Sequence, residues 1–237
     1  GYGHAIAIVG WDDNYSASNF KVTPPGNGAF ICKNSWGTYL GDNGYFYISY
    51  YDKYIGKRSK MAVPASLESN TNYNAVYQYD PLGAVGSYYY DDVSYGANVF
   101  PQRGDALSSN EILRAVSFYT HSKNTSYDVY VIKNYKDKSS LIDLGKAAAS
   151  GTIGEMGYHT TTLDSPVSLS ARTRFAVVIK LTSPDGQPHI YCEYPIENYS
   201  SKARANEDES YLSGDGEHWE DFTNICKNGN LCIKAFT

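Results

Sequence analysis

Methionine, tryptophan and cysteine are scarce in this sequence of 237 residues, with 2, 3 and 4 copies respectively. No stretch approaches the roughly 18 apolar residues of a membrane-spanning helix, so no membrane span is predicted. Basic residues are also few, because 20 Lys and Arg stand against 25 Asp and Glu, giving a net charge of −5. Without a basic cluster, a nucleic-acid-binding surface is not expected.

Metal and cofactor sites are likewise not indicated by the sequence. Its five histidines and four cysteines match no zinc-ligand spacing. The cysteines are Cys32, Cys192, Cys226 and Cys232. They permit two disulfides in three pairings, or none. A disulfide between Cys226 and Cys232 could close a tight turn at residues 228–230, but four reduced thiols are favoured for a chain of this size.

The residues that are abundant indicate a β protein. Hydrophobic residues make up 42% of the chain, which is enough for a sizeable core and excludes disorder of the whole chain. Tyrosine occurs 24 times, glycine 21 times and proline 9 times. This combination is typical of strands joined by many turns.

Residues 1–66 hold three predicted strands, at about 5–9, 29–34 and 44–51. The first is expected to end at Gly10, and residues 13–28 are expected to form a loop because they contain Pro-Pro-Gly. The chain opens almost directly on the first strand, with no start methionine, which predicts that it is the interior of a longer protein.

A polar segment at residues 67–73 is the predicted linker to a second domain at residues 74–237. Predicted strands of this domain lie near residues 75–80, 84–90, 112–120, 126–133, 157–163, 173–181, 188–194 and 230–236. Residues 112–120 also suit a short helix, but their β-rich surroundings favour a strand. About eight strands with long connections predict a jelly-roll type of β-sandwich.

Three polar or aromatic residues of the first segment stand in a distinctive order. Taken singly, His4, Asn34 and Trp36 each have an ordinary structural explanation, as a core histidine, a turn former and a core aromatic. Together, Gly-His-Ala at 3–5, Lys-Asn-Ser-Trp-Gly at 33–37 and Gly-Asp-Asn-Gly-Tyr-Phe at 41–46 resemble the papain-like cysteine peptidases. The match covers roughly residues 3–51.

This resemblance implies a partial papain-like β-barrel subdomain and assigns roles to the three residues. His4 is the expected base, which holds the nucleophilic thiol as a thiolate and later protonates the leaving amine. The amide oxygen of Asn34 is expected to orient the imidazole. Trp36 is expected to cover that hydrogen bond and exclude water from it.

The resemblance covers only the C-terminal part of such a peptidase. In this family the catalytic cysteine and an oxyanion-hole glutamine lie far upstream of the histidine, and neither is found in this sequence. Cys32 lies near Asn34, but its apolar surroundings suit a buried core thiol. The chain is therefore predicted to lack a nucleophile and to be inactive alone, with peptide or protein substrates belonging to the full-length enzyme.

The second domain looks like the lectin-like β-sandwich that follows the peptidase in some bacterial and archaeal members. From this we expect an extracellular or cell-surface protein. The alternative is a non-catalytic carbohydrate-binding or adhesion protein that carries a remnant peptidase segment. The resemblance also predicts that the cleft face around His4 and Trp36 is exposed in this chain and available for self-association.

The sequence does not identify a ligand site in the second domain. A glycan could stack on aromatic side chains, although strand packing explains them better. The candidates are Tyr88, Tyr89, Tyr90, Tyr95, Tyr191, Tyr194, Tyr199 and Trp219. Carboxylates could bind Ca²⁺, but solvated acidic loops are favoured. These carboxylates are Asp208, Asp215, Glu217, Glu220 and Asp221.

Overall fold

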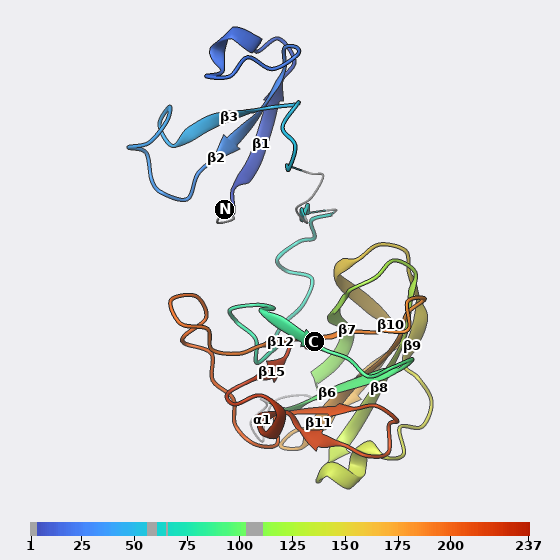
Figure 1. Cartoon of the computed structure of the whole chain (residues 1–237). Coiled ribbons are helices and arrows are strands. Elements are labelled where there is room, and N and C mark those ends of the chain that lie inside the picture. The colour runs from blue at the N-terminus through green and yellow to red at the C-terminus, as the bar shows by residue number, and fades with distance from the viewer. Residues whose placement is uncertain (1–3, 56–60, 65, 103–110) are drawn as a thin grey trace. The chain divides into compact units, whose positions relative to one another are not determined.

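A computed structural model describes residues 4–55, 61–64, 66–102 and 111–237. The chain divides into two compact units, Gly1–Ala65 and Ser66–Thr237 (Figure 1). The regular secondary structure of both units consists mainly of antiparallel strands, so the predicted mainly β fold is confirmed. Among the helices in the described ranges, none is long and apolar enough to cross a membrane.

The first unit contains a three-stranded antiparallel sheet of order β1-β2-β3. Its strands are β1 (Ala7–Asp12), β2 (Ala29–Lys33) and β3 (Tyr45–Ser49), and a short 3₁₀ helix, η1 (Ala17–Asn19), lies in the loop after β1. The prediction that the first strand ends at Gly10 is wrong. The pairing of β1 with β2 shifts between Ile8 and Gly10, so Val9 is the extra residue of a β-bulge, Gly10 pairs with Ile31, and the strand continues to Asp12.

The second unit is a β-sandwich with one additional small sheet. A four-stranded sheet has the order β10-β7-β16-β4, a six-stranded sheet has the order β14-β13-β6-β11-β8-β9, and the small sheet has the order β15-β12-β5. The strands are β4 (Val76–Tyr77), β5 (Gly86–Tyr88), β6 (Ser94–Pro101), β7 (Glu111–Thr120), β8 (Thr125–Tyr135), β9 (Ala149–Ile153), β10 (Gly157–Leu169), β11 (Arg174–Thr182), β12 (Ile190–Glu193), β13 (Ser210–Ser213), β14 (Glu220–Asp221), β15 (Asn230–Leu231) and β16 (Lys234–Phe236). Two short helices, η2 (Lys138–Leu141) and α1 (Phe222–Ile225), lie in connections.

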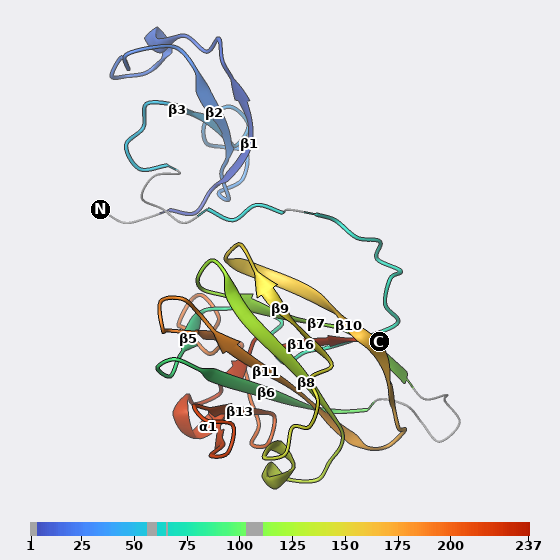
Figure 2. The ribbon, with the colours of Figure 1, turned by 90° about the vertical axis from the view of Figure 1, so that its right-hand side faces the viewer.

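The six-stranded sheet is buried on both faces along part of its length. Figure 2 shows β8, β11 and β6 side by side, with β11 in the middle. Phe175, Val177 and Ile179 of β11 belong to the main core, which also contains side chains from β7 and β10. Ala176 and Val178 point the other way, into a second apolar cluster. Burial on both faces explains why β11 reads as a continuous apolar run.

Several strands of the sandwich differ from the sequence prediction. Residues 112–120 do form a strand, β7, and not a helix. Strands β6, β9, β13 and β14 were not predicted, and the expected strand at 230–236 is split into β15 and β16. The split has a physical cause, because the Asn98 side-chain amide donates to the carbonyls of both Leu231 and Ile233 at 2.9 Å. All four cysteines are free thiols.

Candidate active site

The pairing of β1 with β2 brings His4 and Asn34 to the same end of the first sheet. Ala7, near the start of β1, pairs with Lys33 at the end of β2. His4 lies just before β1 and Asn34 directly follows β2. In an antiparallel pair the start of one strand adjoins the end of its neighbour, so residues 30 positions apart become neighbours in space.

The Asn34 side chain determines the tautomer of the neutral His4 ring. His4 Nε2 lies 2.9 Å from Asn34 Oδ1, and the Ser35 backbone N–H donates to the same oxygen at 2.8 Å. Because a backbone N–H can only donate, the shared amide atom is the carbonyl oxygen, and His4 must donate its Nε2–H to it. In the neutral ring, Nδ1 is then the basic nitrogen that can accept a proton.

Trp36 covers one side of the His4 ring. The two ring centroids are 4.5 Å apart, and the ring planes are tilted by 30°. Trp36 is 52% exposed, and His4 is also exposed. All three residues singled out in the sequence therefore lie together, and the imidazole is open to solvent in this unit.

The loop after β2 holds the Asn34 backbone in place. The Asn34 N–H donates to the carbonyl of Gly44 at 2.9 Å, and the Gly44 N–H donates to that of Leu40 at the same distance. Gly44 has a φ of +88°, and a Cβ on it would come within 2.5 Å of the Gly37 carbonyl oxygen. Only glycine fits both the backbone conformation and the space at this position.

Cys32 is not placed or activated as a nucleophile. Its side chain is fully buried, and burial raises the pKa of its thiol. A reactive cysteine needs the opposite, a lowered pKa and access to solvent. Cys32 is the one cysteine of residues 1–65, and the other three lie in the sandwich.

The acidic residues considered as Ca²⁺ ligands bind the protein itself. The Asp208 carboxylate accepts hydrogen bonds from Arg174 and from the Tyr135 hydroxyl. The backbone N–H and the imidazole of His218 donate to Asp215, and together they lower the pKa of this carboxyl. In the part of the chain that the structure describes, no group of three or more His, Cys, Asp or Glu side chains could hold a metal ion.

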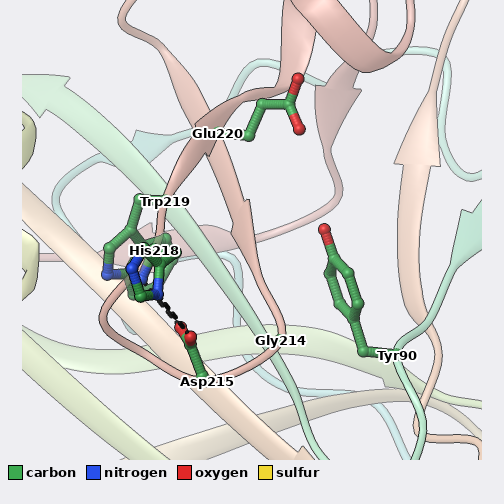
Figure 3. A pocket seen from close by; sticks show the side chains of 6 residues that line it. All are labelled: Tyr90, Gly214, Asp215, His218, Trp219 and Glu220. Atoms are coloured by element: carbon green, nitrogen blue, oxygen red, sulfur yellow. Dashed lines mark hydrogen bonds and ion pairs between the residues drawn. The ribbon is translucent and has the colours of Figure 1, made fainter.

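The candidate aromatic residues differ widely in exposure. Trp219 is only 5% exposed, and its Nε1–H donates to the Gly216 carbonyl, whereas Tyr199 is 77% exposed. A hollow of about 560 Å³ lies between Tyr90 and Trp219. In Figure 3 the Tyr90 hydroxyl points toward Glu220, while His218 and Asp215 face each other. Gly214 completes the lining.

Residues that sequence reasoning did not select form a second hollow on the six-stranded sheet. It has a volume of about 260 Å³ and is lined mostly by residues with polar side chains. Its lining residues are Ser126, Tyr127, Asp128, Ser150, Gly151, Thr152, Lys180 and Thr182. In the sequence, the only indication of this hollow is that polar side chains alternate along residues 126–128 and 180–182. The register of β11 and β8 is what places these polar residues next to each other.

Comparison with known families assigns both units. Residues 76–237 match the family model of the lectin-like domain. The chain belongs to the lectin-like domain family. Residues 1–68 match the papain family cysteine protease model, so both resemblances inferred from the sequence are confirmed.

Solved structures combine the same two units. The clostridial cysteine protease Cwp84 after propeptide cleavage is 29% identical with a TM-score of 0.75, and the match covers 98% of this chain and 57% of that one. The cysteine protease and lectin-like domains of Cwp84, a surface layer associated protein of Clostridium difficile, give 30% identity, a TM-score of 0.76, and coverages of 97% and 50%. The whole chain, with both units, thus spans about half the length of these relatives. No curated protein matches it.

Proposed function

We propose that this chain supplies the His/Asn part of a cysteine endopeptidase, which hydrolyses peptide bonds by a Cys/His/Asn mechanism. The observation that carries the proposal is the hydrogen bond of His4 Nε2 to Asn34 Oδ1, an oxygen that the Ser35 N–H also binds. This arrangement leaves Nδ1 basic and orients the ring, as a catalytic base requires.

In this mechanism His4 takes up and releases a proton twice. Its Nδ1 takes the proton of the attacking thiol, and the thiolate forms a bond to the substrate carbonyl carbon. The resulting imidazolium then gives the proton to the leaving amine as the peptide bond breaks and a thioester remains. Nδ1 next takes a proton from water, which attacks the thioester, and returns that proton to the departing thiolate. Asn34 keeps the ring oriented through both steps, and Trp36 reduces the access of water to their hydrogen bond.

The nucleophile comes from residues outside this chain, and the chain alone does not turn over peptides. This part of the proposal is supported by the burial of Cys32 and by the raised pKa of its thiol. The first unit also exposes large apolar side chains, which suit a surface that packs against the thiol-bearing half or against a second copy. These side chains are Val9, Trp11, Trp36, Tyr39 and Leu40.

We further propose that the protein acts outside the cell or at its surface. Support comes from Cwp84, which is described as a surface layer associated protein and shares both units. The lectin-like domain, in this proposal, holds the enzyme on a glycan.

The test compares this chain with the natural protein extended upstream of Gly1. The chain alone is expected neither to cleave casein nor to be labelled by the thiol inhibitor E-64. The extended protein is expected to do both. His4→Ala in the extended protein should lower its kcat/KM on the order of 10³-fold or more. Asn34→Ala should cause a smaller loss.

His218→Ala is the matched control, because His218 is an exposed histidine with a carboxylate partner, far along the chain in the lectin-like domain. It should leave peptidase activity unchanged. An extended protein without activity, or with activity that survives His4→Ala, would overturn the proposal. Rapid labelling of Cys32 by E-64 in this chain would show that the nucleophile had been wrongly excluded.

A second candidate is the non-catalytic carbohydrate-binding or adhesion protein. It is favoured by the match to the lectin-like model, which covers most of the chain. This candidate predicts an inactive extended protein that is retained on a polysaccharide column. The same assay therefore separates the two functions.

A further inference from the structure

Within the second unit, part of the outer face of the six-stranded sheet is not covered by apolar side chains. Along β11, Ala176 and Val178 lie in the second apolar cluster, which also contains Leu141 and Trp219 from the connections. Two residues further along the same face, Lys180 and then Thr182 are only half-buried. The apolar cluster therefore covers this face of β11 as far as Val178. From Lys180 onward the same face carries polar side chains.

These polar side chains form two rows that run across three strands. In antiparallel sheets, side chains of directly paired residues lie on the same face. The register pairs β11 with β8 and β8 with β9. The first row is Lys180, Asp128 and Ser150, and the second is Thr182, Ser126 and Thr152. These six residues account for most of the lining of the 260 Å³ hollow, and none of them is buried.

The charges in the hollow balance each other. Lys180 Nζ lies 3.6 Å from Asp128 Oδ2, and each side chain is about one third exposed, at 31% and 32%. The Ser150 hydroxyl donates to the other carboxylate oxygen, Asp128 Oδ1, at 2.7 Å. The carboxylate is thus oriented from two sides, and a charged ligand gains no net attraction from the pair.

The hydroxyls can still bind a ligand. Ser126 Oγ and Thr152 Oγ1 are 3.0 Å apart, so one of them donates to the other. Each hydroxyl has one donor and two acceptor positions, so this contact uses only part of their capacity. A ligand that offers both donors and acceptors, such as a sugar hydroxyl, matches this set better than a carboxylate or an ammonium group does.

An aromatic side chain borders the rows on the next strand. Tyr95 of β6 pairs with Lys180, whose Nζ lies 5.9 Å from the Tyr95 ring centroid. On its other side, Tyr95 meets Trp219 edge to face, with centroids 6.1 Å apart. Trp219 in turn lines the 560 Å³ hollow of Figure 3. A half-buried aromatic ring beside polar groups offers the C–H face of a sugar ring a surface to pack on.

We propose that the two polar rows of β11, β8 and β9, together with Tyr95, bind an uncharged oligosaccharide that lies across the strands. The inference deepens the glycan-holding role proposed above by naming its location and the neutral character of its ligand. It does not depend on the peptidase chemistry, because no residue of the first unit takes part.

The proposal can be tested on this chain by titration calorimetry and by amide NMR shifts. The probes are neutral hexasaccharides, of β-1,4-linked glucose, α-1,4-linked glucose, α-linked mannose and β-1,4-linked N-acetylglucosamine, with hexagalacturonate as the anionic probe. At least one neutral probe is expected to bind and to shift the amide signals of β8, β9 and β11. Hexagalacturonate is expected not to bind there.

Ser150→Trp fills the hollow from an exposed position on β9 and should weaken this binding at least about ten-fold. Thr162→Trp adds the same side chain at an exposed position of β10, on the other sheet, and should leave binding unchanged. Binding by none of the neutral probes, binding that survives Ser150→Trp, or preference for hexagalacturonate would each overturn the inference. None of these outcomes bears on peptidase activity, which the casein assay tests separately.

Discussion

Asn34 Oδ1 accepts two hydrogen bonds, one from the Ser35 N–H and one from His4 Nε2–H. The bond from Ser35 identifies this atom as the carbonyl oxygen, so His4 must be the donor in the other bond. The Ser35 N–H comes from the adjacent residue, so its position follows from the local backbone. Asn34 itself is held by the carbonyl of Gly44. The protonation pattern of His4 therefore depends on loop geometry as much as on the two side chains.

Replacing Asn34 by Ala should change the tautomer of His4. Without the amide oxygen, nothing holds the proton on Nε2, so the neutral ring should become a mixture of both tautomers. The measurement is a ¹⁵N-detected NMR experiment on the imidazole nitrogens at about pH 8, where an ordinary histidine is neutral.

Asn14→Ala is the matched control, because Asn14 is an exposed asparagine of the same unit. It should leave the Nε2–H form dominant. Equal spectra for Asn34→Ala and the unmodified chain would mean that the 2.9 Å contact does not control the ring.

At the scale of elements, the sequence predicted strands where β propensity and apolar periodicity agree, as in β2, β7 and β11. It also predicted the grouping of His4, Asn34 and Trp36, because their order along the chain is distinctive. It missed β6, whose Gly96 reads as a breaker. That glycine is required by packing, since a Cβ on it would lie 2.8 Å from Ile190 Cγ2. Such a contact between distant residues has no local signal in the sequence.

A buried ion pair ties β16 to the segment after β4. Lys234 Nζ lies 2.8 Å from Asp80 Oδ2, and the two side chains are 14% and 0% exposed. Burial raises the pKa of Asp80, and Lys234 opposes this by favouring the carboxylate. Lys234→Met leaves the carboxylate buried without its cation, so it should destabilise the lectin-like domain by about 3–5 kcal/mol near neutral pH.

The sign of the pH dependence follows from the raised pKa of Asp80. In the Lys234→Met variant this pKa should rise further, so acidification protonates the carboxyl in the folded state and removes the buried charge. The loss of stability should shrink as the pH falls from about 7 to about 5. Urea unfolding at both pH values measures it. The control is Lys133→Met, at an exposed lysine of β8, which should change the free energy of unfolding little at either pH. A destabilisation by Lys234→Met that is the same at both pH values would contradict this account.

At the scale of the whole molecule, the buried apolar side chains are unevenly distributed. Both hydrophobic clusters consist of residues from the lectin-like domain. Within the described residues of the first unit, the buried apolar side chains are Ala29 and Cys32. A three-stranded sheet with so little buried apolar area has marginal stability in water.

Limited proteolysis should therefore remove the first unit before the second. With low amounts of thermolysin, we expect early cleavage within residues 4–55 and a persistent fragment close to Ser66–Thr237, both identified by mass spectrometry. Local opening governs such cleavage, and it is frequent where few apolar contacts are buried. In the extended protein, the thiol-bearing half should cover the exposed apolar residues such as Trp11 and Trp36, and cleavage within 4–55 should become slower. Equal protection of both units in this chain would mean that the first unit is stable by itself, and its exposed apolar surface would then need an explanation other than a missing half.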